Sequence, residues 1–129
     1  MEAMSSSDAP DFVCLNFANP DMVGHTGVFD AVVAACEETD RQLSRVLEVG
    51  KEAGYAFVII ADHGNAELAR NPDGSPHTAH TTNLVPMLVI GEGVTGAADG
   101  ILADVAPTVL DLMGLEVPKE MTGTSRVLR

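Results

Sequence analysis

The sequence predicts an α/β fold in which a mostly parallel sheet is flanked by helices. Three apolar runs, at residues 12–17, 55–60 and 85–90, have the composition of strands that are covered on both faces. A long amphipathic segment follows the first run, and a short helical pattern follows the third. Strands that alternate with helices usually pair in parallel through crossover connections, so this order predicts a sheet that is parallel at least in part.

The first half of the chain predicts one strand, one turn and one long helix. The run at 12–17 holds β-branched and aromatic residues and ends before Pro20, which suits the first turn of a helix. Residues 29–47 carry apolar side chains at three- and four-residue intervals and predict an amphipathic helix of roughly five or six turns. Gly50 and Gly54 mark its end.

The second half predicts two strands, a long loop between them and a short helix. The strand at 55–60 runs into polar residues, and residues 67–82 are rich in Asn, Pro, Gly, Ser, His and Thr, which predicts a loop. Loops of this length usually carry function. After the strand at 85–90, Asp104 is expected to cap a helix that Gly114 ends.

Charge and composition exclude several classes of function. The 129 residues include 7 Lys and Arg against 19 Asp and Glu, which gives a net charge of −12. This charge argues against nonspecific binding to nucleic acid or to anionic membranes. The longest unbroken apolar run, residues 55–61, is far shorter than a membrane span. With 46% hydrophobic and 20% charged residues, the chain is expected to be soluble and to form a real core.

The N-terminus and the cysteines indicate a cytoplasmic protein. Residues 1–10 are small and polar, so we expect a disordered leader at 1–10 and a folded segment at 11–129. The leader has neither the basic nor the apolar region of a signal peptide. Cys14 and Cys36 lie inside apolar patterns and are expected to be core residues in a reducing compartment.

Four histidines follow predicted strands: His25, His63, His77 and His80. In open α/β sheets, ligands bind beyond the carboxyl ends of the strands, so these side chains are expected to converge. Asp21 and His25 have an i, i+4 spacing behind Pro20, which aims the carboxylate and the imidazole the same way. Asp62 and His63 come directly after a buried strand, and the loop ending in His80 is long enough to fold back over the sheet edge.

Mixed carboxylate and imidazole ligands suit manganese, zinc or iron. The number of ligands makes a pair of metal ions plausible, and bound cations would let so acidic a chain accept a phosphate. Each residue taken singly also has a simpler reading: Asp21 as the cap of a turn, His25 as a surface residue, Asp62 as part of a turn. His77 has a weaker case than His80. Taken together, the residues favour a metal site.

Five ordered blocks of sequence resemble those of the cofactor-independent (2,3-bisphosphoglycerate-independent) phosphoglycerate mutases of the alkaline phosphatase superfamily. They are Asn16 to Gly27, Ala61 to Glu67, His77 to Asn83, Ile101 to Thr108, and Met121 to Gly123. The resemblance runs from about Asp11 to the end of the chain. It implies part of an alkaline-phosphatase-like sheet and identifies the chain as the C-terminal part of such an enzyme, a fragment or truncated product.

The resemblance also implies a metal centre and a reaction. The family holds two Mn²⁺ ions, although Zn²⁺ or another divalent ion is an alternative. By resemblance, Asp21, His25 and His80 would hold the first ion, and Asp62 and His63 would contribute to the second. A serine of the family carries the phosphoryl group as phosphoserine while 3-phosphoglycerate and 2-phosphoglycerate, intermediates of glycolysis, are interconverted.

The sequence departs from the family in lacking the segment with that serine and the inserted domain that grips the substrate. Ser5, Ser6 and Ser7 lack the expected strand context, so no catalytic residue is assigned and the chain alone is expected to be inactive. The incomplete sheet predicts an exposed edge open to self-association or pairing with another chain. Two alternatives remain: a metal-dependent phosphatase or phosphodiesterase of the same superfamily, and a non-catalytic metal-binding module that needs a partner chain.

Overall fold

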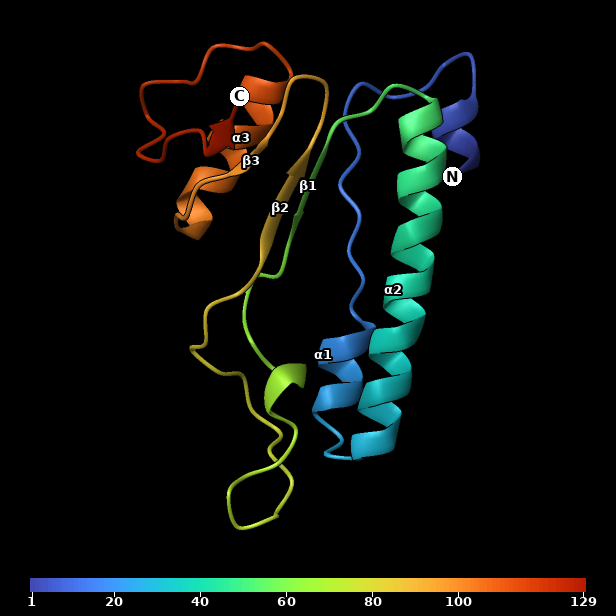
Figure 1. The fold of residues 1–129 in the computed structure, drawn as a ribbon, viewed down its shortest axis with the longest axis vertical. Helices are drawn as coiled ribbons and strands as arrows, with labels where there is room; N and C mark the ends of the chain where they lie inside the picture. The colour runs from blue at the N-terminus through green and yellow to red at the C-terminus, as the bar shows by residue number, and fades with distance from the viewer. The chain divides into compact units, whose positions relative to one another are not determined.

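Most of the predicted helices and strands have counterparts in the computed structural model, which describes all residues from Met1 to Arg129 (Figure 1). The chain forms two units, each built from two stretches of sequence. The first unit comprises Met1–Ala53 and His63–Leu84, and the second comprises Gly54–Asp62 and Val85–Arg129. None of the helices has both the length and the apolar character needed to cross a bilayer.

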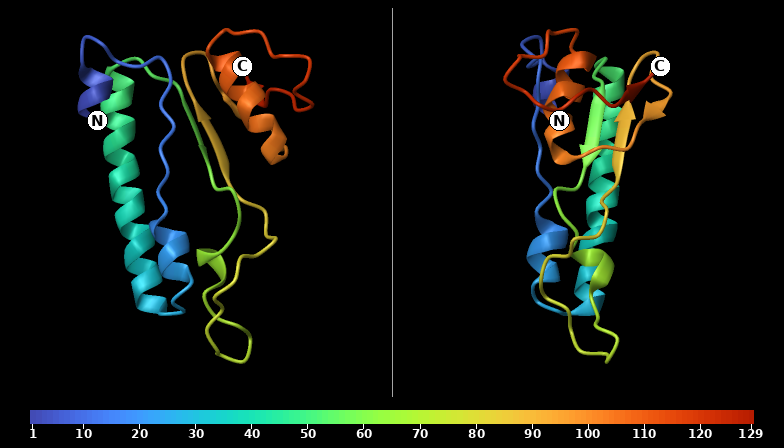
Figure 2. Two further views of the ribbon diagram at one scale, coloured as in Figure 1. Left: turned by 180° about the vertical axis from the view of Figure 1, so that it is seen from behind. Right: turned by 90° about the vertical axis from the view of Figure 1, so that its left-hand side faces the viewer.

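The first unit is organised around the long helix predicted from the apolar periodicity. This helix, α2 (Phe29–Glu52), packs against the short helix α1 (Asn19–Gly24), and the two lie side by side in Figure 2. A 3-10 turn, η1 (Glu2–Ser5), also contacts α2 and buries Met4. Part of the predicted leader therefore has local structure, and the division of the chain at residue 10 stays a prediction.

The strand predicted at 12–17 does not form. These residues run as an extended chain along α2 (Figures 1 and 2), but they pair with no strand. Phe12 and Leu15 are 56% and 55% exposed, so the apolar run that suggested a doubly covered strand is open to solvent. A segment forms a strand only when a neighbouring strand pairs with its backbone N–H and C=O groups. The structure has no such neighbouring strand for residues 12–17. The prediction that Cys14 and Cys36 are core residues is also wrong, because both are exposed, Cys14 on this segment and Cys36 on α2.

The second unit contains two antiparallel ladders. Strand β1 (Phe57–Ile60) pairs with β2 (Met87–Ile90) in the register Phe57 to Ile90, and β3 (Gly96–Ala97) pairs with β4 (Val127–Leu128). The predicted parallel orientation is therefore wrong for both pairs. A parallel pair needs a crossover, usually a helix, whereas residues 61–86 hold only a 3-10 turn, η2 (Ala66–Leu68), and return as a loop. Helix α3 (Val105–Leu112) packs against β1.

Asp104 anchors the end of the chain within the second unit. Its buried carboxylate accepts hydrogen bonds from the backbone N–H groups of Ile101 and Thr124 and forms an ion pair with Arg126 at 2.7 Å. The sequence had suggested that Asp104 caps α3. Its side chain instead caps the 3-10 turn η3 (Leu102–Asp104). The hydrogen bond from Arg126, together with these backbone donors, lowers the pKa of Asp104 from its ordinary value of 3.8 to about 2.

This depressed pKa predicts an acid-sensitive second unit. The unfolded chain takes up the proton at a higher pH than the folded chain, so the stabilisation is complete above about pH 4 and is lost as the pH falls toward about 2. Asp104→Asn should lower stability at neutral pH and flatten the decline across this window, measured by urea unfolding at stepped pH. Asp99→Asn, an exposed residue of the same unit, is the control. Equal pH slopes for wild type and Asp104→Asn would contradict the assignment.

Candidate metal centre

Helix α1 sets the first two residues of the site. Pro20 lies in its first turn, where its missing N–H costs nothing, and Asp21 follows in the same turn. His25 caps the other end of α1, one turn later, so both side chains lie on one side of the helix. Asp21 Oδ1 lies 3.3 Å from His25 Nε2, which confirms the proximity predicted from the i, i+4 spacing.

His80 meets this pair from the loop that precedes β2. Its Nε2 atom lies 3.0 Å from Asp21 Oδ1 and 3.2 Å from His25 Nε2, so the loop folds back as predicted. A metal with bonds of about 2.1 Å would hold neighbouring ligand atoms about 3.0–3.4 Å apart in octahedral or tetrahedral geometry. The three atoms already have the separations that one small divalent cation would impose.

The hydrogen bond of the His25 ring also suits a metal ligand. Its Nδ1 atom lies 2.7 Å from the carbonyl oxygen of Thr78. A carbonyl can only accept, so Nδ1 carries the proton and donates it. In the neutral ring, Nε2 is then left with a lone pair directed at the Asp21 and His80 side. A backbone carbonyl that fixes the tautomer in this way is the usual partner of a metal-ligating histidine.

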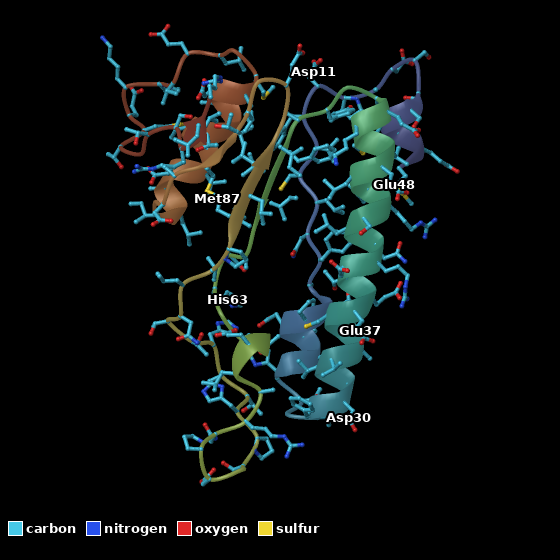
Figure 3. All side chains as sticks on the ribbon, viewed as in Figure 1. Asp11, Asp30, Glu37, Glu48, His63 and Met87 are labelled. Carbon is cyan, nitrogen blue, oxygen red and sulfur yellow. The ribbon has the colours of Figure 1, made fainter.

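His63 adjoins the cluster through its contact with His80. The two rings stack with their centroids 3.7 Å apart, and ligand atoms of Asp21, His63 and His80 all lie within 4.8 Å of one another. Figure 3 labels His63 where the chain turns from β1 toward η2. Asp62, the preceding residue, belongs to the second unit, and its part in a metal site stays a prediction.

His77, for which the sequence made a weaker case than for His80, is tied to the loop by its backbone. Its N–H donates to the carbonyl of Ala69, while its Nδ1 atom is buried and has no hydrogen-bond partner. Asp21, His25 and His80, in contrast, keep 35%, 44% and 48% of their side-chain surface exposed. An ion held by these three residues would therefore have an open side, as catalytic metal sites do.

Asn65 orients the Asp21 carboxylate. Its side-chain amide donates to Asp21 Oδ1 at 2.9 Å, and the residue itself is buried. Gly24 of α1 permits this approach, because a Cβ atom at that position would overlap with the side-chain oxygen of Asn65. The carboxylate oxygen that faces both histidines is thus held from a third direction.

Glu67 links the two arms of the 61–86 loop, one of which carries His63 and the other His80. Its carboxylate accepts hydrogen bonds from Asn65 N, Thr81 Oγ1 and Asn83 Nδ2. These bonds, that from Thr81 first, lower the pKa of Glu67 from 4.5 to about 2. No role for Asn65, Glu67 or Thr81 was predicted from the sequence. Their positions within the same motif blocks as His63 and His80 were the only available signal.

The sequence matches a known family over most of its length. A family model described as the metalloenzyme superfamily matches residues 1–117. The chain belongs to the metalloenzyme superfamily. Two observations together indicate that the family site binds a divalent metal ion. They are the match to this superfamily and the cluster formed by Asp21, His25, His63 and His80.

The relatives confirm the resemblance seen in the motif blocks. The 2,3-bisphosphoglycerate-independent phosphoglycerate mutase of Salinibacter ruber is 60% identical over 110 residues, which cover 84% of this chain and 21% of the relative. The enzyme of the same name from Paracoccus denitrificans is 58% identical over 122 residues, with 92% of this chain and 24% of the relative covered. The chain thus spans about a quarter of the length of these curated relatives.

A solved structure confirms the fold class. The crystal structure of Leishmania mexicana phosphoglycerate mutase at low cobalt concentration matches 98% of this chain and 26% of its own, with a TM-score of 0.84 and 29% sequence identity. The α/β fold predicted from the sequence is therefore that of a phosphoglycerate mutase segment. Within this segment, the strand pairs present are antiparallel.

Proposed function

We propose that the chain is the C-terminal segment of the metal-binding, phosphatase-like domain of a phosphoglycerate mutase. In this proposal Asp21, His25 and His80 hold the first of two Mn²⁺ ions, and Asp62 and His63 contribute to the second. The complete enzyme interconverts 3-phosphoglycerate and 2-phosphoglycerate in glycolysis, in the cytoplasm. The observation that carries the proposal is the convergence of one carboxylate oxygen and two imidazole nitrogens at 3.0–3.3 Å.

The protein's own residues prepare this site. Thr78 keeps the proton of His25 on Nδ1, and Asn65 holds the Asp21 oxygen toward both rings. When bound, a divalent ion supplies positive charge that attracts phosphoryl oxygens and lowers the pKa of a nucleophile. Such charge offsets the repulsion between a phosphorylated substrate and a chain of net charge −12.

No nucleophile is assigned within the chain. Ser6 donates its hydroxyl hydrogen to the carbonyl of Ala3 in the η1 turn, which is a local contact. The phosphoserine step is therefore proposed to need a serine that these residues do not supply. We also propose that the extended, exposed segment 12–17 pairs with another chain, because its apolar side chains and backbone groups have no strand partner here.

Calorimetric titration of chelator-treated protein with Mn²⁺ tests the proposal, run beside a mutase assay and sedimentation velocity. We expect one tightly bound ion per chain, no mutase turnover, and self-association that Leu15→Glu on the exposed segment weakens. Two tight ions in a strict monomer would show that the second site is complete without another chain. Hydrolysis of a generic aryl phosphate ester would favour a phosphatase, and absence of Mn²⁺ binding would overturn the proposed centre.

A further inference from the structure

We propose that Glu67 is a positioning residue of the metal centre, one that sets the distance between the two arms of the 61–86 loop, which carry His63 and His80. This inference rests on the proposed function, because it concerns the same cluster of ligands. Glu67 acts through Asn65, Thr81 and Asn83, the three residues that donate to its carboxylate.

Glu67 bridges the two arms of the 61–86 loop close to the histidines that they carry. The backbone joins the two arms at two isolated bridges. One pairs Arg70 with Pro76, and the other, beside the two histidines in the sequence, pairs Gly64 with Thr81, whose N–H donates to the carbonyl of Gly64 at 2.8 Å. Glu67 adds contacts from its side chain on either side of that bridge, to Asn65 N at 2.6 Å and to Asn83 Nδ2 at 2.9 Å. The stacked rings of His63 and His80 lie directly beside this connection in the sequence.

The Glu67 carboxylate is also connected to Asp21, through Asn65. The Asn65 backbone N–H is fixed by Glu67, while the Asn65 side chain donates to Asp21 Oδ1 at 2.9 Å. One residue therefore connects Glu67 to the carboxylate that faces His25 and His80. Removal of Glu67 would release both the histidine loop and the restraint on Asp21.

The three hydrogen bonds to the Glu67 side chain require a carboxylate at this position. Three donors point at the two oxygens of Glu67, and an ionised carboxylate is an acceptor at every position. A glutamine would replace one oxygen with an NH₂ group, which would face a donor in either orientation. Gly64 keeps the space open, since a Cβ atom there would overlap with Thr81 Oγ1 and Glu67 Oε1.

Glu67→Gln tests this role, with Glu48→Gln on the exposed surface of α2 as the matched control (Figure 3). Loss of hydrogen-bond partners of metal ligands typically weakens metal binding about 10–100-fold, and we expect a loss in this range for Glu67→Gln. Thr81→Val, which removes only one donor, should give a smaller loss. Calorimetry measures the Mn²⁺ affinity, and the visible absorption of the Co²⁺-loaded protein reports the ligand geometry. The melting temperature of the metal-free protein reports folding.

The outcomes separate this inference from the proposed function. If wild type and Glu48→Gln bind Mn²⁺ equally and Glu67→Gln binds more weakly with an altered Co²⁺ spectrum, the positioning role is supported. If all three bind Mn²⁺ equally, or if Glu67→Gln lowers only the metal-free melting temperature, the role is overturned and the metal centre stands. If wild type binds neither Mn²⁺ nor Co²⁺, the proposed function fails first.

Discussion

Asp21→Ala is expected to abolish the response of the protein to Mn²⁺. Asp21 Oδ1 is the atom on which His25, His80 and Asn65 converge, and it supplies the negative charge nearest to both histidines. Loss of a ligand should exceed the about 10–100-fold effect of losing a neighbouring hydrogen bond, so we expect Mn²⁺ affinity to fall by more than about 100-fold.

The effect is measured as a loss of thermal stabilisation. Metal at about 100 times its dissociation constant stabilises a folded chain by about 2.7 kcal/mol, which corresponds to roughly 10 °C in a protein of this size. We expect this shift in wild type and in Asp30→Asn, an exposed residue of α2 (Figure 3), but not in Asp21→Ala or His80→Ala. A full shift in the Asp21 variant would mean that the ion binds elsewhere.

Gly123→Ala is expected to have the largest effect on stability within the second unit. A Cβ atom at this position would lie 2.6 Å from the carbonyl carbon of Ala103 and would overlap with its oxygen. Backbone atoms cannot move aside as a flexible side chain can, and the neighbouring hydrogen bond from Thr124 N to Asp104 holds the segment in place. Overpacking of this kind costs about 1–3 kcal/mol, so the melting temperature should fall by roughly 4–12 °C.

Gly96→Ala is the matched control for this prediction. Gly96 lies in β3 of the same unit, where a Cβ atom would meet only Leu128 Cδ1, at 4.0 Å. The same added methyl group is therefore expected to change the melting temperature little, as seen by circular dichroism. If both variants melt together with wild type, the close approach of residues 103 and 123 is not a constraint on the fold.

Local periodicity and spacing could be predicted because they depend on neighbours in the sequence. The apolar pattern at 29–47 predicted α2, and Pro20 with the Asp21 and His25 spacing predicted the turn that begins the site. Residues 12–17 show the limit of this reasoning. Their composition suits a strand, but composition does not reveal whether a partner strand is present.

The orientation of β1 and β2 and the contacts of Glu67 depend on how a long loop returns. Residues 61–86 show no helical periodicity, but this absence alone did not reveal whether the strands on either side would pair in parallel or antiparallel. The histidines were recognisable because imidazole has a known chemistry with metals. Glu67 and Asn65 were not, since their role depends on contacts with Thr81 and Asp21, 14 and 44 residues away.

X-ray absorption spectroscopy of the Mn²⁺-loaded chain tests directly whether Asp21, His25 and His80 share one divalent cation. Imidazole rings give characteristic outer-shell scattering that carboxylates and water do not. We expect at least two imidazoles on the metal in wild type and one fewer in His80→Ala. A shell made only of oxygen, or a wild-type spectrum unchanged in His80→Ala, would contradict it.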